Sequence, residues 1–216
     1  MELSLAVPLS TAQIEAANRL HGKLLQWQVT DRALHTLQEN LPGFDIEATL
    51  LKVVAVNQLY GTNVYAVVRM AHHVTEVVQD VSGMEEADLV EELATLNGRK
   101  HRSFASKLAH FFIDMERFPI FDSFAVKMVA HHLGARELAR DSAHPYRAFV
   151  ENICKLKRYA GLSCTTKELD RYLWLAGLYQ AWRRNTTSQI NAEVAEMFKS
   201  PSPEATTDLA ILLPSK

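Results

Sequence analysis

Cysteine and long apolar stretches are both scarce in this 216-residue sequence. The two cysteines, Cys154 and Cys164, form no closely spaced pair, so neither a disulfide framework nor a Cys-based metal site is indicated. We expect both thiols to be buried or idle. No stretch approaches the roughly 20 consecutive apolar residues of a membrane-spanning helix, and the first residues lack the basic and apolar parts of a secretory signal. These absences predict a soluble, cytoplasmic protein that does not associate with membranes.

Cofactor-binding motifs are also missing. The sequence contains neither a Walker phosphate loop nor the glycine fingerprint of dinucleotide-binding domains, which disfavours ATP and NAD chemistry. Two adjacent histidine pairs, His72-His73 and His131-His132, are accompanied by no His-Glu-x-x-His motif and no Cys/His cluster. Adjacent side chains diverge by about 100° on a helix, so one histidine of each pair is expected to be packed and the other exposed. We therefore predict no metal and no cofactor.

What the sequence does contain is helical periodicity. Apolar residues recur with the 3.6-residue spacing over 64–78 and again over 121–129, and alternating strand-like runs are absent. Capping boxes, in which two residues satisfy each other's free amides at a helix start, are a further helical signal. Their spacing occurs at Ser10 and Gln13, at Ser82 and Glu85, and at Thr165 and Glu168. The sequence therefore predicts an all-α fold.

The pattern predicts about ten helices. They are expected at 11–28, 31–40, 45–60, 63–79, 84–95, 102–113, 121–133, 146–160, 166–184 and 188–199. Segment 45–60 is apolar around most of its circumference and should be a central helix. Residues 1–200 should form one helical domain, either compact or divided into two lobes that flank a cleft. Residues 201–216 have loop composition, and we expect a tail that is frayed or held down by Leu209, Ile211, Leu212 and Leu213.

The net charge of -2 conceals an uneven distribution. Residues 1–98 contain 5 Lys/Arg and 13 Asp/Glu, residues 99–158 contain 12 and 6, and residues 159–216 contain 6 of each. A basic central third is what a local contact with nucleic-acid phosphates requires. The charge pattern therefore permits DNA binding without establishing it.

The most informative segment is 96–134. It begins with the turn Leu96-Asn97-Gly98 and a basic stretch, continues through an apolar helix, and reaches Pro119-Ile120-Phe121-Asp122-Ser123 before the next helix. This order resembles the helix-hairpin-helix DNA glycosylase superfamily. In that superfamily a Leu-Pro-Gly-Val-Gly hairpin opens one helix and a Pro-Val-Asp-Thr segment opens the next. The resemblance extends over 57–134, with the helix-hairpin-helix itself at about 84–134.

The resemblance implies an enzyme that hydrolyses the N-glycosidic bond of a damaged or modified base in DNA. Asp122 would be the key carboxylate: at a helix start beside a cleft, it would stabilise the cationic sugar and orient the attacking water or amine. The base would flip into that cleft. The hairpin amides and the following helix N-terminus would hold a DNA phosphate. The DNA-binding residues carried over are Gly98, Arg99, Lys100, His101, Arg102 and Ser103.

The hairpin departs from the superfamily pattern. Asn97 stands where the proline is expected and Lys100 replaces the second glycine, so phosphate contact would rely more on side chains. One branch of the superfamily uses a lysine at the start of the following helix to form a Schiff base. Counted back from Asp122, that position falls at Arg102 or Ser103, and neither can form the imine. We therefore predict a monofunctional, water-using glycosylase, with Lys100 and Lys107 as alternative amine nucleophiles.

Two further regions are predicted to contact a base. A polar break between two apolar helices resembles the turn, rich in Asn or Gln, that enters the duplex and fills the space of the flipped base. The residues carried over are Asn57, Gln58, Tyr60 and Asn63. Tyr60 could equally stack on a base. In the aromatic stripe of 170–184, Tyr172 and Trp174 are expected either to pack in the core or to recognise the base.

Two alternatives stay open. Asp is among the best N-cap residues, so Asp122 could serve only to begin its helix. The chain could also be a non-catalytic helical module that binds nucleic acid or protein. The preferred prediction is an enzyme that acts on DNA as a monomer, in repair or in defence against modified foreign DNA, with the identity of the base left open.

Overall fold

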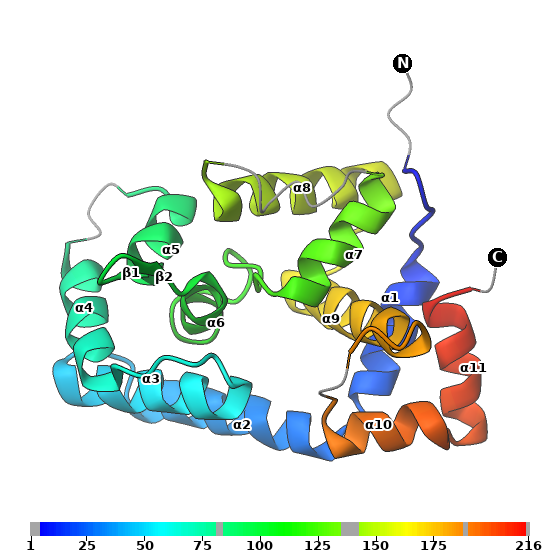
Figure 1. Cartoon of the computed structure of the whole chain (residues 1–216), viewed down its shortest axis with the longest axis horizontal. Coiled ribbons are helices and arrows are strands. Elements are labelled where there is room, and N and C mark those ends of the chain that lie inside the picture. Colours follow the sequence, from blue (N-terminus) through cyan, green and yellow to red (C-terminus); the bar gives the residue numbers. More distant parts are fainter. Residues whose placement is uncertain (1–4, 81–83, 135–142, 188–189, 215–216) are drawn as a thin grey trace.

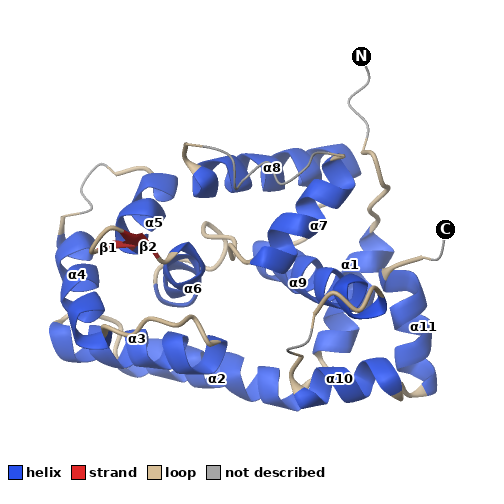
Figure 2. Cartoon of the chain, in the orientation of Figure 1, coloured by secondary structure: helices blue, strands red, loops and turns tan. Residues whose placement is uncertain are grey.

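The computed structural model describes residues 5–80, 84–134, 143–187 and 190–214. Within these residues the chain forms eleven helices and one short hairpin (Figure 1). The helices are α1 (Thr11–His21), α2 (Leu25–Asn40), α3 (Ile46–Tyr60), α4 (Val67–Gln79), α5 (Glu86–Ala94), α6 (Arg102–Phe112), α7 (Ser123–Leu133), α8 (Pro145–Ala160), α9 (Thr166–Arg183), α10 (Ala192–Lys199) and α11 (Pro203–Leu212). The predicted all-α fold is confirmed, because the two strands are only two residues each (Figure 2).

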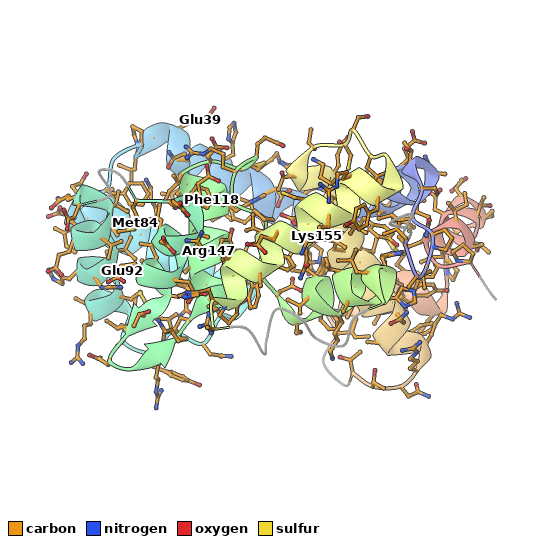
Figure 3. The ribbon with its side chains drawn as sticks, turned by 90° about the horizontal axis from the view of Figure 1, so that it is seen from above. Glu39, Met84, Glu92, Phe118, Arg147 and Lys155 are labelled. Atoms are coloured by element: carbon orange, nitrogen blue, oxygen red, sulfur yellow. The ribbon has the colours of Figure 1, made fainter. Side chains whose placement is uncertain are left out.

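The helices pack in two groups that share one continuous apolar core (Figure 1). In the first group α3 packs against α4 and α6, and α5 packs against α6. In the second group α9 packs against α1 and α7, and α1 also packs against α11. Helix α8 contacts α5 of the first group and α7 of the second. Figure 3 shows α8 running from Arg147, beside the first group, to Lys155, beside the second.

Local capping explains two of the helix starts. At α9 the Thr165 amide donates to Oε2 of Glu168 at 2.8 Å, and the Glu168 amide donates to Oγ1 of Thr165 at 3.2 Å. At α1 the Ser10 amide donates to Oε1 of Gln13 at 3.0 Å. These contacts confirm two predicted capping sites. The third, at Ser82, lies outside the described residues.

The predicted single helix over 11–28 is wrong. Helix α1 ends at His21, and a new helix, α2, begins at Leu25. The carboxylate of Glu193, in the first turn of α10, accepts the amides of Leu25 at 2.6 Å and Gln26 at 3.1 Å. This long-range cap satisfies free donors at the start of α2, and local periodicity carries no sign of it.

The sequence pattern also missed the hairpin of β1 (Thr95–Leu96) and β2 (Arg99–Lys100). The strands are antiparallel and pair Thr95 with Lys100. The two turn residues, Asn97 and Gly98, have φ values of +50° and +73°. Positive φ at both positions is the type I′ conformation that Asn-Gly favours. A tight β-hairpin therefore stands between α5 and α6 where a glycosylase-like hairpin was predicted.

The C-terminal segment is held against the body of the protein. Helix α11 begins at Ser202, whose Oγ accepts the Ala205 amide at 3.3 Å, and it packs against α1. The loop predicted over 201–216 is therefore wrong for Pro203–Leu212, which is helical, whereas the burial of Leu209 and Leu212 agrees with the alternative of a tail that is held down. Within the described ranges, no helix combines the length and the apolar content needed to cross a bilayer.

Candidate functional site

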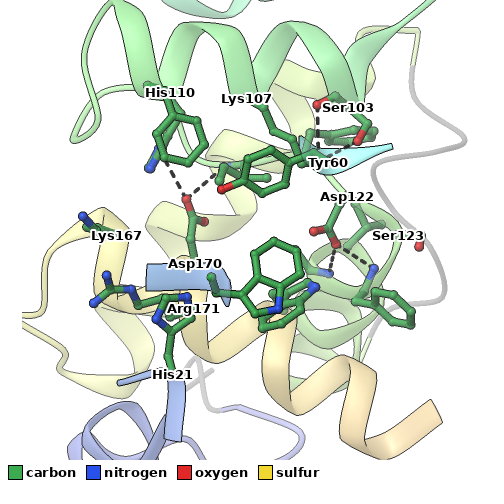
Figure 4. Close-up of a pocket in the computed structure, with 18 of the residues that line it drawn as sticks. His21, Tyr60, Ser103, Lys107, His110, Asp122, Ser123, Lys167, Asp170 and Arg171 are labelled. Atoms are coloured by element: carbon green, nitrogen blue, oxygen red, sulfur yellow. Dashed lines mark hydrogen bonds and ion pairs between the residues drawn. The ribbon is translucent and has the colours of Figure 1, made fainter. Parts of the chain in front are cut away.

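A pocket of about 480 Å³ opens between the two groups of helices (Figure 4). Its walls come from α1, α2, α3, α6, α7, α9 and the connector between α6 and α7. One wall is aromatic and consists of Trp27, Tyr60, Phe111 and Trp174. The titratable side chains that reach the pocket include Lys107, His110, Asp122 and Asp170. Such a mixture of apolar walls and a few polar groups is typical of a ligand site, and the volume lies within the usual range of small-molecule pockets.

Asp122 is at once the N-cap of α7 and a residue of the pocket wall. Its Oδ1 atom accepts the amides of Phe124 and Ala125, both at 2.8 Å. Both bonds use the same oxygen, and Oδ2 makes no hydrogen bond within the described residues. Capping therefore leaves one carboxylate oxygen available to a ligand. Asp122 can therefore cap α7 and contact a ligand in the pocket at the same time.

The connector that leads to Asp122 is residues 118–121. The backbone of each of these four residues is hydrogen-bonded to a buried side chain. These contacts join His110 Nδ1 to the Phe118 carbonyl (2.9 Å), Tyr146 Oη to the Pro119 carbonyl (3.1 Å), Asp170 Oδ2 to the Ile120 amide (3.0 Å) and Ser106 Oγ to the Phe121 amide (3.0 Å). The side chains come from α6, α8 and α9. A segment held from three helices presents Asp122 in one fixed geometry, which is the condition for electrostatic preorganisation.

Lys107 brings an amine into the same pocket from α6. Its Nζ atom donates to Oγ of Ser103 at 2.8 Å, one turn earlier on the helix. Burial lowers the pKa of the Lys107 ammonium, and the negative charges of Asp122 and Asp170 act in the opposite direction. A desolvated lysine with a lowered pKa carries more of the neutral amine, the form that attacks an electrophile.

Asp170 is the most deeply buried carboxyl of the pocket, with a side chain 8% exposed. Burial raises its pKa well above the ordinary range; the Ile120 hydrogen bond opposes this shift, and Asp122 reinforces it. Figure 4 shows Asp170 directed from α9 toward His110, whose Nδ1 lies 3.7 Å from Oδ2. Burial also lowers the pKa of His110 to about 4. His110 is therefore uncharged near neutral pH, and burial favours the protonated form of Asp170.

The aromatic wall is continuous. The rings of Trp27 and Trp174 are 4.8 Å apart between centroids, those of Trp27 and Tyr60 are 5.6 Å apart, and those of Tyr60 and Phe111 are 5.5 Å apart. Burial raises the pKa of the Tyr60 hydroxyl, and so does the negative charge of Asp31. A wall of this kind offers flat faces on which a heterocycle can stack.

A cationic rim borders the pocket on the side of α9. Oδ2 of Asp31 lies 3.2 Å from an Arg171 nitrogen and 3.9 Å from Nζ of Lys167, so one carboxylate serves two cations. His21, also in the pocket wall, has its pKa lowered to about 4, mainly by burial and secondly by the charge of Arg171. The rim therefore carries a net positive charge beside the aromatic wall.

The predicted phosphate-binding residues lie mostly outside the pocket. Gly98, Arg99 and Lys100 are exposed on the hairpin, and Lys100 donates to Thr95 within it. His101 follows them at the start of α6, and its pKa is lowered by partial burial and by Arg99. Of the predicted hairpin residues, Ser103 lines the pocket.

Arg102 was predicted to contact a phosphate, but in the structure it pairs with a carboxylate. Its Nε atom lies 2.8 Å and 2.9 Å from the two carboxylate oxygens of Glu91, and its side chain is 23% exposed. A guanidinium held by a carboxylate in this way is already neutralised and oriented, so it is poorly placed to bind a phosphate.

The predicted base-contacting residues divide into three sets. Tyr60 and Trp174 line the pocket, and Gln58 and Asn63 are exposed on α3 and the turn after it. Asn57 is occupied within that turn, where its Oδ1 accepts the Val64 amide at 2.8 Å and its Nδ2 donates to the Val64 carbonyl at 3.0 Å. Asn57 therefore organises the turn and is not free to enter a duplex.

Tyr172 lies in the core and does not line the pocket. Its ring is fully buried, and its hydroxyl bonds Nε2 of His132 at 2.7 Å in the contact of α7 with α9. The core alternative for Tyr172 is therefore the right one. His132 is held on its other side by the Val7 carbonyl at 2.9 Å, so it is the packed member of its pair.

Several residues of the site were not predicted. Trp27, His110 and Asp170 stand in segments that the sequence pattern explains as ordinary amphipathic helix, and they meet because three helices converge. A buried carboxyl is rare without a partner. The carboxyl of Asp170 could have drawn attention as an acidic residue on the apolar side of its helix.

Comparison with known proteins relates the first part of the chain to one family model. The model, HI_0787_N, is described as an N-terminal domain and matches residues 13–117. A Haemophilus influenzae protein described as uncharacterized is 29% identical over 141 residues, which is 61% of this chain and 67% of the relative. No solved structure matches the chain. The family match includes Trp27 and Lys107 and ends before Asp122 and Asp170.

Proposed function

We propose that the protein is a DNA glycosylase that breaks the N-glycosidic bond of a damaged or modified base, with Asp122 as its key carboxylate. The observation that carries the proposal is the position of Asp122, which begins α7 at the wall of an aromatic-lined pocket. Its fixed connector and its unused Oδ2 atom support a catalytic role beside its role as a cap.

The chemistry follows from what each group can supply. A base that enters the pocket stacks on the aromatic wall, and its sugar remains at the mouth beside Asp122. The bond between C1′ and the base breaks, and the base leaves with the bonding electron pair and takes up a proton. The Asp122 carboxylate stabilises the positive charge on the sugar. Water then bonds to C1′ and gives its proton to Asp122.

Lys107 offers a second nucleophile in the same pocket. Of the predicted amine candidates it is the buried one with a lowered pKa, whereas Lys100 is exposed on the hairpin. If the Lys107 nitrogen bonds to C1′ in place of water, opening of the sugar ring leaves a Schiff base to the enzyme. This step needs no oxidant, reductant or cofactor. The sequence favoured attack by water. The burial of Lys107 in the pocket gives stronger support to attack by an amine than the sequence provided.

The proposal is tested on DNA duplexes that each carry one modified base, by scoring abasic sites under single-turnover conditions. Asp122→Asn retains an N-cap and removes the negative charge, so excision should fall by about 10²–10⁴-fold with DNA affinity nearly unchanged. Asp45→Asn is the matched control, because Asp45 caps α3 by accepting the Ala48 amide and does not line the pocket. Equal inactivity of the wild type and Asp122→Asn on every substrate would favour a non-catalytic binding module.

A further inference from the structure

Two buried polar atoms, from residues that line the pocket, have no hydrogen-bond partner among the described residues. They are Oδ1 of Asp170, on α9, and the indole Nε1 of Trp27, on α2. Both residues line the pocket, and the Asp170 side chain is 8% exposed. An unsatisfied buried polar group costs roughly 1–3 kcal/mol, so two at one pocket need an explanation. A ligand that bonds both atoms supplies one.

We propose that Asp170 and Trp27 are the specificity-determining residues of the pocket, and that they select a base with carbonyl oxygens on its edge. This inference rests on the proposed function for the identification of the ligand as a nucleobase. The two residues act on recognition of the base, whereas Asp122 acts on the bond that breaks.

The selection for carbonyl groups follows from the hydrogen-bonding capacity of the two atoms. An indole Nε1–H can only donate. In Asp170 the Oδ2 atom already accepts the Ile120 amide at 3.0 Å, so a neutral carboxyl carries its proton on Oδ1 and donates from there. Two donors can hydrogen-bond to carbonyl oxygens. They disfavour amino groups, because an amino group also presents hydrogens and offers no acceptor.

The surroundings of Asp170 favour the neutral form of its carboxyl. Its nearest titratable neighbour, His110, uses Nδ1–H to donate to the Phe118 carbonyl at 2.9 Å and is itself uncharged. Besides burial, the negative charges of Asp122 and Glu116 favour the protonated form of Asp170, and Lys107 opposes them. One backbone amide is too little to hold a buried carboxylate ionised. This is the arrangement by which a carboxylic acid acts as a donor at neutral pH.

The test compares hypoxanthine with adenine as free bases: hypoxanthine has a carbonyl at C6 and a hydrogen on N1, whereas adenine has an amino group at C6 and an unprotonated N1. Binding to the full-length protein is measured by calorimetry. We expect hypoxanthine to bind at least about tenfold more tightly. Trp27→Phe keeps an aromatic ring and removes the N–H donor, and should weaken the binding of hypoxanthine about fivefold. Cys154→Ser, at an exposed position on α8, is the control.

Asp170 is tested with a pair of variants that differ in one property. Asp170→Asn keeps a neutral donor opposite the Ile120 amide, whereas Asp170→Leu keeps the size and removes the donor. Leu should therefore weaken hypoxanthine about tenfold or more, and Asn should restore binding to within about threefold of the wild type. An Asn variant as weak as the Leu variant would show that an ionised carboxylate binds the ligand, and would overturn the proposal.

Other outcomes separate this inference from the proposed function. Equal affinity for the two purines, or binding of neither, overturns the selection for carbonyl groups. Excision of a base without edge carbonyls would overturn the selection and leave the glycosylase proposal in place. A clear preference for hypoxanthine without excision of any base from DNA would leave the recognition pair in place and overturn the glycosylase.

Discussion

Nζ of Lys107 lies 2.8 Å from Oγ of Ser103, one turn earlier on α6, and both side chains line the pocket. Ser103 is one of the two positions at which the resemblance to glycosylases suggested a lysine, and the amine is present one turn later on the same helix. The helical repeat thus brings an amine to the side of the pocket where Ser103 lies. The nucleophile can therefore be decided by a direct chemical test.

Borohydride should trap Lys107 to DNA if the amine attacks C1′. We expect a covalent protein–DNA adduct with the wild type and a loss of at least about tenfold in Lys107→Gln. The exposed Lys100→Gln is the matched control and should be trapped like the wild type. The readout is the shifted band on a denaturing gel. Base excision without any trapped adduct would instead assign the attack to water.

Asp122 should contribute to stability only as a helix cap. Asp122→Ala removes the acceptor for two amides and should lower the free energy of unfolding by about 1 kcal/mol. Asp122→Asn retains a capping oxygen and should change it by a few tenths of a kcal/mol. Urea unfolding of both variants measures this difference. If Asn were as destabilising as Ala, a loss of excision in Asp122→Asn could not be attributed to charge.

Gly177 permits close packing between α9 and the start of α7. A Cβ atom added there would lie 2.7 Å from the Phe124 carbonyl oxygen, closer than packed atoms allow. Gly177→Ala should therefore lower the free energy of unfolding by roughly 1–3 kcal/mol and displace Phe124, a residue of the pocket wall. Gly43→Ala is the control, because its added Cβ would meet Asp45 at an ordinary 3.5 Å. Denaturant unfolding that gave equal stabilities for the two variants would contradict the packing argument.

Buried His132 should make the protein less stable in mild acid. Its pKa is lowered to about 4, mainly by burial, whereas the ordinary value is 6.5. Between these values the unfolded chain binds a proton that the folded protein does not, so stability falls as the pH decreases from about 6.5 to about 4. The full contribution is roughly 3 kcal/mol. The pKa of His132 is lowered because its imidazolium form would lose its hydration between α7 and α9.

The measurement is urea unfolding across this pH range. His132→Gln should flatten the dependence of stability on pH, although it lowers stability at neutral pH by removing the contacts with Val7 and Tyr172. His35→Gln, at an exposed position on α2, should leave the slope as in the wild type. An unchanged slope in His132→Gln would assign the acid sensitivity to the other buried histidines, His21 and His110.

Helical periodicity was sufficient for the fold class because each helix encodes its own buried face and, in several cases, its own cap. Thr165 and Glu168 show this most clearly, since both capping partners are within one turn of each other. The break at 22–24 has one local signal, Gly22, which is the C-cap of α1 and which the periodicity argument passed over. The cap of α2 comes from Glu193, which is far away in the sequence.

The candidate site was only partly predictable for the same reason. Asp122 was identified because a short Pro-containing connector and a helix start are local patterns. Tyr60 and Trp174 were among the predicted base contacts and do line the pocket, whereas Tyr172, two residues before Trp174, is in the core. Periodicity places residues on faces of a helix, but the neighbour that each face meets is a tertiary property.

By itself the sequence determined that this chain is helical, where most of its helices lie and that Asp122 begins one of them. Those features depend on apolar spacing and on capping groups a few residues apart. Only the tertiary structure decided that Lys107, Asp170 and Trp27 share a pocket with Asp122. Their proximity, and the burial that shifts the pKa values of Lys107 and Asp170, arise from helices that converge in space and are distant along the chain.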